Sequence, residues 1–269
     1  MLEHFFNSRI LGRILKSKML YLGLCIEAVL VVLDHITMYK RYDSVEPLLP
    51  QNAYVSWMGF VGVSVYSFIF YTIVPLIVVI PAVNMFCSDI NSGFYRQYIT
   101  RMGKKKYYSE WRKNIFWAGF SIIFVSLLLS LMISLCLYPA LKPDQYIGLG
   151  PRRDVYFFKI FYYHPLVYSF IYIILNALLG GVLAVISAAS YFVYYNKIVS
   201  MLFPFLIFYI LSVLNNIFDL DYLICPGDFL QPGTSISSWI SVATLLGFVC
   251  VEKALWFYAS HRRDEELIG

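Results

Sequence analysis

Charged side chains are scarce in this sequence. Asp, Glu, Lys and Arg make up 14% of its 269 residues, whereas soluble proteins carry about 25%. Hydrophobic residues make up 60% of the chain, which includes 23 Tyr and 22 Phe. So few charges cannot cover that much apolar surface in water, and the same figures exclude a disordered chain, a collagen and a secreted disulfide scaffold. The composition predicts an all-α, polytopic membrane protein.

Metal and catalytic motifs are also absent from the sequence. The five cysteines are an odd number and form no CxxC or Cys/His cluster, so neither a disulfide framework nor a zinc site is expected. There is no Walker lysine loop, HExxH or GxSxG, and no two of the four histidines stand at ligand spacing. We therefore expect no catalytic residue, no metal ligand, no cofactor and no enzymatic activity in this chain.

Long stretches without charge divide the chain into segments of the length, roughly 20 residues, that crosses a bilayer as a helix. We predict a single transmembrane domain over residues 1–269, with six spans near 19–38, 60–86, 115–138, 166–190, 199–218 and 238–258. Pro75 and Pro81 fall inside the second span and predict a kink in one continuous helix. Gly180 and Gly181 in the fourth span favour a close approach to another helix.

The positive charges lie unevenly around these spans. Fifteen of the 21 Lys and Arg residues fall at the N-terminus, in the 87–114 and 191–198 loops and in the C-terminal tail. Loops rich in Lys and Arg stay in the cytoplasm, so we expect a multi-pass protein of the cell membrane with both termini cytoplasmic. The net charge of +5 follows from this topology. We expect the lipid bilayer to surround the chain, and we expect no nucleic-acid partner.

Residues 1–18, before the first span, have an amphipathic pattern. In a helix over residues 2–16, Arg9, Arg13 and Lys16 share one face and aliphatic side chains occupy the other. This pattern favours an interfacial helix on the inner membrane surface. The alternative is a positive flank that only sets the topology.

The segment between the second and third spans, residues 87–113, has the most distinctive pattern. Asp89 or Ser92 is suited to cap a short helix that begins near Gly93, and Gly103 is suited to end it. One face of this helix would be aromatic and aliphatic, with Phe94, Tyr95, Tyr98 and Ile99. Arg96 would lie on the far side and Arg101 at the edge. Such a helix suits insertion into a groove of a cytosolic partner.

This segment resembles the first cytoplasmic loop of permeases of the type-2 ABC exporter superfamily. The shared pattern is an acidic residue, a glycine four positions later, a basic and apolar helix, and a basic turn followed by Tyr. It matches here at Asp89, Gly93, Arg96, Ile99, Lys105 and Tyr108. The junction of the fourth and fifth spans, residues 190–205, is also similar to that family. The sequence departs from it at Met102-Gly103, where many members have a proline within a small-residue turn.

The resemblance implies a transport subunit that depends on a separate ATPase. Residues 87–113 would form the coupling helix that docks on an ATP-binding cassette ATPase, which would bind ATP and Mg. The implied coupling residues are Asp89, Gly93, Phe94, Arg96, Tyr98, Ile99, Arg101, Lys105 and Tyr108. A second copy of the permease, as a homodimer, would complete the transporter. It would export a hydrophobic or amphipathic substrate such as a peptide, toxin or antibiotic.

Two acidic residues interrupt the first span, where a charge is costly. Glu27 and Asp34 are seven residues apart and fall on nearly the same face of a helix. They are candidates for an acidic stripe that lines the substrate path or for a proton site, and the alternative is a pair that packs helices together. Glu252 and Lys253, near the inner end of the sixth span, are expected to reach the membrane interface by snorkelling.

Two other classes of function stay open at this point. An ion-coupled secondary carrier would use the buried carboxyls and the prolines inside its spans, although no repeat is evident. A membrane-embedded accessory factor or enzyme acting on lipids or peptides would need a cluster of polar groups at one depth. Glu27 and Asp34 are the only such pair in the sequence.

Overall fold

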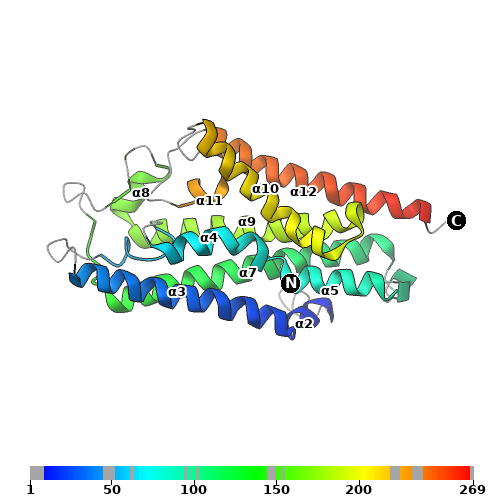
Figure 1. Cartoon of the computed structure of the whole chain (residues 1–269), viewed down its shortest axis with the longest axis horizontal. Helices are drawn as coiled ribbons and strands as arrows, with labels where there is room; N and C mark the ends of the chain where they lie inside the picture. Colours follow the sequence, from blue (N-terminus) through cyan, green and yellow to red (C-terminus); the bar gives the residue numbers. More distant parts are fainter. Residues whose placement is uncertain are drawn as a thin grey trace.

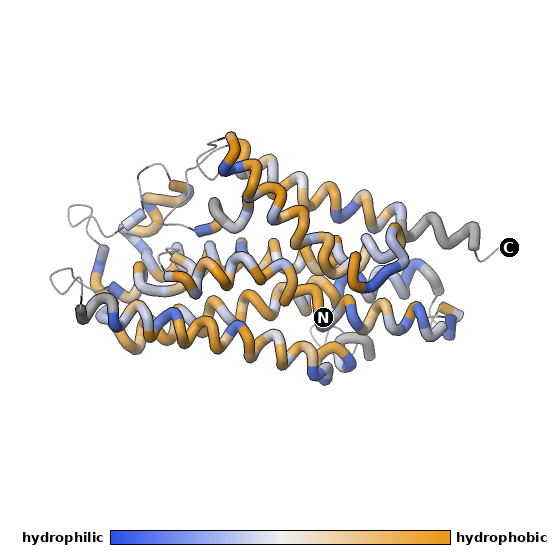
Figure 2. Tube along the Cα trace, in the orientation of Figure 1, coloured by the Kyte–Doolittle hydropathy of each residue, from blue (hydrophilic) through white to orange (hydrophobic). Residues whose placement is uncertain are grey.

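The computed structural model is built from α-helices throughout the part of the chain that it describes (Figure 1). It describes residues 9–44, 52–60, 64–93, 96–97, 99–100, 103–143, 150–151, 153, 155–218, 225–231 and 239–266. The long helices run along the long axis of the molecule. Hydrophobic residues follow most of their length (Figure 2).

Five helices are long and apolar enough to cross a membrane, within the described residues. They are α3 (Lys18–Ser44), α7 (Lys104–Leu137), α9 (Pro165–Tyr194), α10 (Lys197–Phe218) and α12 (Trp239–Glu266). These five cover the predicted first, third, fourth, fifth and sixth spans. The prediction of an all-α, polytopic membrane fold is confirmed at this level.

The outer surface of the bundle carries large apolar side chains. Phe68, Ile210 and Leu246 are each more than half exposed, at 68%, 56% and 60%. In water such a surface would drive association, whereas in lipid tails it is favourable. Its apolar character therefore agrees with a bilayer as the surroundings of these helices.

The predicted second span is divided in the structure into α4 (Val65–Ile77) and α5 (Ile80–Asn91). Pro75 lies inside α4, and Pro81 lies in the first turn of α5. Proline has no backbone N–H, so Pro81 cannot donate to the carbonyl of Ile77, and the helix is interrupted at that point. The single kinked helix predicted over 60–86 is thus two helices, each too short to cross a bilayer alone.

Helix α9 is the central helix of the bundle. Its most apolar stretch is 67% buried, against 22% for α10 and for α12. The neighbouring helices α7, α10 and α12 all pack against it. An apolar helix surrounded by others in this way needs no polar face, and its side chains form much of the core.

The close approach predicted for Gly180 and Gly181 is confirmed, and α7 is the helix that approaches. A Cβ atom added to Gly119 of α7 would lie 2.7 Å from the carbonyl oxygen of Gly180. One added to Gly181 would lie 2.9 Å from the carbonyl oxygen of Phe116. Only glycine fits there, because the two backbones touch.

The predicted 87–113 loop is shorter in the structure. Helix α5 continues to Asn91 and α7 already begins at Lys104. The extra turns of α7 bury Tyr107, Tyr108 and Trp111. This packed face stabilises the helix well beyond the span that the charge-free stretch defines.

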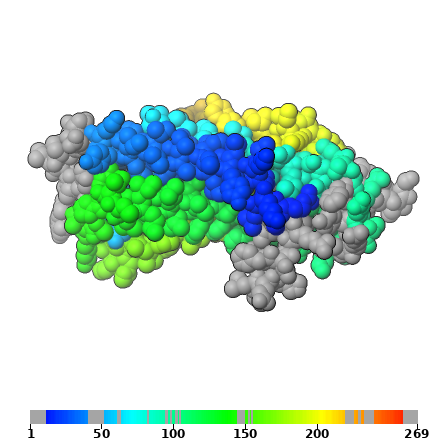
Figure 3. Space-filling model, turned by 90° about the horizontal axis from the view of Figure 1, so that it is seen from below, coloured from blue at the N-terminus to red at the C-terminus, as the bar shows by residue number. Residues whose placement is uncertain are grey.

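Three short helices complete the described fold. They are α2 (Arg9–Leu15), α8 (Phe158–Tyr163) and α11 (Pro226–Phe229). Helix α2 packs on α5 and α7, and α8 and α11 lie toward the opposite end of the bundle (Figures 1 and 3). Residues 2–8 of the predicted amphipathic helix lie outside the described residues.

Candidate functional site

At one end of the bundle α5 ends, α7 begins and α12 ends (Figure 1). Helix α2 packs on α5 and α7 beside these turns, and we call the four elements together the loop end. A two-pronged ion pair joins two of its elements, as Arg13 of α2 donates from both terminal nitrogens to the two carboxylate oxygens of Asp89 of α5, each at 2.8 Å. Asp89 is 5% exposed. Bidentate, charge-assisted bonds to a buried carboxylate hold both partners in one geometry.

The Arg13–Asp89 contact differs from the capping role that the sequence suggested for Asp89. Asp89 does not cap the next helix, because Arg13 engages its carboxylate, and the Ser92 hydroxyl turns back to the carbonyl of Asp89 at 3.4 Å. One sequence signal was available, since Asp89 is the only acidic residue between Glu46 and Glu110. An isolated carboxylate at the end of an apolar span needs a cation nearby.

Helix α2 carries positive charge and also packs on α5 and α7. Ile14 is fully buried beneath it, whereas Lys16 is exposed. The side chain of Arg9 lies outside the described residues. Figure 3 shows this segment against the surfaces of α5 and α7. The α2 segment is therefore packed onto the bundle through Ile14 and Arg13.

Two glycines border the segment between α5 and α7. Gly93 and Gly103 have φ angles of 72° and 80°, in the left-handed region that glycine adopts without strain. The Gly103 amide donates to the carbonyl of Ile99 at 2.9 Å, as at a helix end. The predicted start and end of the short helix agree with these two positions.

The side chains between the two glycines have different exposures. Arg96, Gln97 and Thr100 are exposed, and Ile99 packs partly against the core. Phe94, Tyr98 and Arg101 lie outside the described residues. The described part of the segment is thus mostly exposed and polar.

The remaining predicted coupling residues lie in α7. Lys105 is exposed, but Tyr108 is only 4% exposed. The Tyr108 ring packs against Phe192 of α9 and Trp256 of α12, at centroid distances of 5.9 and 6.3 Å. Tyr108 is therefore an interior residue beneath the loop end. A second link runs from α9, where the Tyr191 hydroxyl donates to the Asn91 side chain.

The two carboxyls of α3 have different surroundings. Asp34 is 2% exposed and accepts a hydrogen bond from the Ser64 hydroxyl, which itself caps α4 by accepting from the Ser67 amide at 3.1 Å. Glu27 is fully buried, and in the described part of the chain neither of its carboxyl oxygens has a hydrogen-bond partner. Asp34 has a clear role in packing α3 on α4, and Glu27 has none.

The structure adds a buried histidine that sequence reasoning did not single out. His35 Nε2 lies 3.0 Å from the carbonyl oxygen of Ser130 and 3.1 Å from its hydroxyl oxygen. That hydroxyl also accepts from the Met58 amide at 2.9 Å. His35 thus joins α3, α7 and the segment before α4. Its position next to Asp34 was the only sequence signal.

Across the described residues, no three His, Cys, Asp or Glu side chains are grouped as a metal site would require. The geometry therefore offers an ion-paired, glycine-bordered loop end and an unpartnered carboxyl inside the bundle. Comparison of the chain with protein families, with curated proteins and with solved structures found no match.

Proposed function

We propose that this chain is the membrane-spanning permease subunit of an ATP-driven exporter of the type-2 ABC kind. In this proposal the loop end faces the cytoplasm, both termini are cytoplasmic, and α4 and α5 together form the second of six crossings. The Arg13–Asp89 ion pair is the observation that carries the proposal. It couples α2 to the segment that we assign to ATPase docking.

The loop end is built to transmit force into the bundle. Asp89 and Asn91, just before Gly93, are held by α2 and by α9 respectively. Tyr108, just after Gly103, is held by α9 and α12. A partner that pushes on the exposed residues between the glycines would therefore move several helices rather than bend one loop.

The ATPase would be a separate chain that binds ATP and Mg, and a second copy of the permease would complete a homodimer. The substrate would be hydrophobic or amphipathic, such as a peptide, toxin or antibiotic. Aromatic walls at the other end support this class of cargo, because Phe68, Phe205 and Tyr209 line a cavity between α4 and α10. Transport would carry it outward as the ATPases close.

A Walker-type ATPase encoded in a neighbouring reading frame would support this proposal, and co-purification of that ATPase with this chain tests the docking assignment. Arg96→Glu should weaken recovery of that ATPase and reduce vanadate-sensitive ATP hydrolysis, because it reverses an exposed charge between the glycines. Lys142→Glu makes the same reversal at an exposed site after α7, and should change neither. Unchanged complex and hydrolysis in Arg96→Glu and in Gly93→Pro would show the docking assignment to be wrong.

Glu27 favours one alternative, an ion-coupled secondary carrier. A fully buried carboxyl without a hydrogen-bond partner is a group that proton-coupled proteins use. Under this alternative, transport would continue without ATP, would stop when the proton gradient is collapsed, and would be lost in Glu27→Gln. Under the exporter proposal, ATP-dependent transport should persist in Glu27→Gln.

A further inference from the structure

A second ion pair lies at the loop end and was not expected from the sequence. Arg112 of α7 donates from Nε and Nη2 to the carboxylate of Glu252 of α12, at 2.7 and 3.0 Å. Glu252 is 6% exposed, so it is held inside by Arg112 instead of snorkelling to the interface. The pair bridges two helices that both pack on α9.

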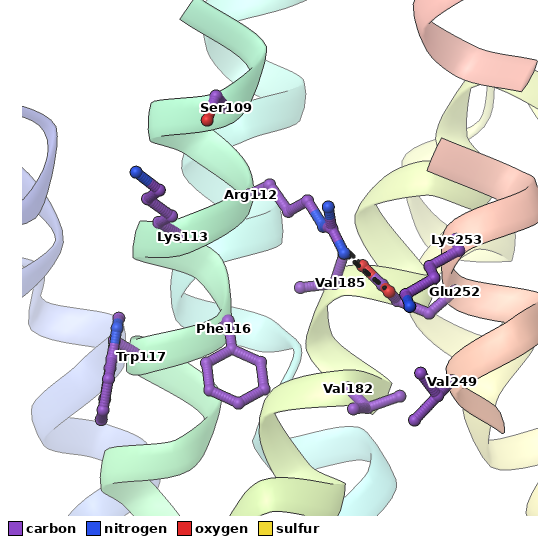
Figure 4. A pocket seen from close by; sticks show the side chains of 10 residues that line it. All are labelled: Ser109, Arg112, Lys113, Phe116, Trp117, Val182, Val185, Val249, Glu252 and Lys253. Atoms are coloured by element: carbon purple, nitrogen blue, oxygen red, sulfur yellow. Dashed lines mark hydrogen bonds and ion pairs between the residues drawn. The ribbon is translucent and has the colours of Figure 1, made fainter. Parts of the chain in front are cut away.

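A groove opens around this pair, with α7 and α12 as its walls and α9 as its floor (Figure 4). Its volume is about 400 Å³, within the range of about 300–1,000 Å³ that is usual for small-molecule sites. The residues that line the groove are of two kinds, apolar and positively charged. Phe116, Val185 and Val249 form its apolar part, and Arg112, Lys113 and Lys253 bring positive charge.

The polar and apolar residues are separated along the groove. On α7, Arg112 and Lys113 stand one turn closer to the loop end than Phe116. Helix α12 runs the opposite way and repeats the arrangement, since Val249 lies one turn deeper in the bundle than Lys253. The groove therefore has a charged mouth near the loop end and an apolar interior toward the middle of the bundle.

The charge at the mouth favours an anion. Lys113 and Lys253 are exposed, and within the described residues neither forms an ion pair. Arg112 is 41% exposed and uses Nε and Nη2 for Glu252, which leaves Nη1 available to a ligand. Three cations against the one carboxylate of Glu252 leave an excess of positive charge.

We propose that this groove is a binding site for an anionic phospholipid. The phosphate headgroup would lie at Arg112 between the two lysines, and an acyl chain would follow Phe116 and Val249 into the bundle. Trp117, at 40% exposure, also borders the groove. Basic pockets between helices on the cytoplasmic side are suited to anionic headgroups. The proposal does not depend on the exporter assignment.

Quenching of Trp117 fluorescence by brominated lipid tests this site in the full chain. The protein is placed in nanodiscs of phosphatidylcholine that contain a small fraction of brominated phosphatidylglycerol or, in parallel, of brominated phosphatidylcholine. The Trp117 signal is the part lost in Trp117→Phe. We expect the anionic brominated lipid to quench it at a several-fold lower fraction than the zwitterionic one.

Charge variants show whether the lysines cause this preference. In Lys113→Gln with Lys253→Gln, brominated phosphatidylglycerol should bind the groove roughly 30-fold more weakly, so that quenching of Trp117 needs a correspondingly higher fraction of this lipid. The matched control, Lys105→Gln with Lys106→Gln, removes two exposed charges outside the groove and should leave it unchanged. Inorganic phosphate in excess should not relieve the quenching. Relief by phosphate would overturn a lipid site in favour of a free-phosphate site.

A steric variant tests the acyl chain separately. Val249→Phe should fill the interior of the groove and abolish the preference, whereas Val251→Phe, at an exposed position of the same helix that does not line the groove, should retain it. The proposal is overturned if the two brominated lipids quench equally. It is also overturned if the preference survives both the double lysine variant and Val249→Phe. Neither result would bear on ATPase docking.

Discussion

Arg13 and Asp89 are 76 residues apart in the sequence, yet their side chains form the two-pronged contact that joins α2 to α5. The carboxylate is buried and the guanidinium is 36% exposed. Solvent screens part of the attraction on the exposed side. Loss of the arginine nevertheless leaves a buried charge without its partner, which is the larger penalty.

Arg13→Ala should therefore lower the free energy of unfolding in detergent by about 1–3 kcal/mol. Lys16→Ala, an exposed position just after α2, should change it by less than about 0.5 kcal/mol. Thermal unfolding followed by circular dichroism measures both. A double-mutant cycle with Asp89→Ala should show a coupling between the two positions. Additive effects would mean that the ion pair adds no stability.

Glu27 and Asp34 lead to opposite expectations at the residue scale. Glu27→Met should raise stability by about 1–3 kcal/mol, because it replaces a buried polar group that lacks a hydrogen-bond partner. Asp34→Leu should lower stability, because the Ser64 hydroxyl loses its acceptor at the start of α4. Thermal unfolding of the two variants side by side checks this difference. Destabilisation of the same size in both would contradict it.

Helices α7 and α9 approach each other closely because glycines, which have no side chain, stand at their contact. Gly119→Val should destabilise the protein by about 1–3 kcal/mol, because a Cβ there would collide with the carbonyl oxygen of Gly180. Gly247→Val is the matched control, since nothing lies within 4 Å of a Cβ at that position of α12. Differential scanning fluorimetry of the purified variants compares them. Equal stability of the two variants would contradict the close approach.

The division of the second span shows how local chemistry alters an element that the charge pattern defines. The charge-free stretch predicts that residues 60–86 are apolar enough for a membrane. It does not show whether one helix or two fill that length. Pro75 and Pro81 were recognised as causes of a kink, and in the structure the backbone interruption at Val78–Val79 separates α4 from α5. The boundary between α4 and α5 depends on which backbone carbonyls lose their N–H donors to proline.

For the molecule as a whole, the orientation in the membrane is testable at the two ends of α7. In a cysteine-free background, Lys142→Cys should react with a membrane-impermeant maleimide in intact cells, because Lys142 is exposed and follows the far end of α7, the helix that begins at the loop end. Lys105→Cys should react only after the membrane is permeabilised. Labelling of both in intact cells, or of Lys105→Cys alone, would contradict the proposed orientation.

The candidate site was predictable in part. Gly93 and Gly103 marked the borders of the segment between α5 and α7 because glycine is favoured where φ is positive. The sequence also placed Tyr108 in this segment, but the structure buries its ring against Phe192 and Trp256. Whether an aromatic residue next to a basic turn faces a partner or the core depends on helices that are distant in the sequence.

The sequence alone predicted an all-α, membrane-spanning fold and the positions of the five long helices that the described residues contain. It could do so because burial in lipid depends on local hydrophobicity over one helix length. Only the tertiary structure decided that Arg13 meets Asp89 and that Arg112 meets Glu252. It also decided that Glu27 is left without a partner. These contacts join residues far apart in the chain, and they depend on the rotation and neighbours of each helix, which packing around α9 sets.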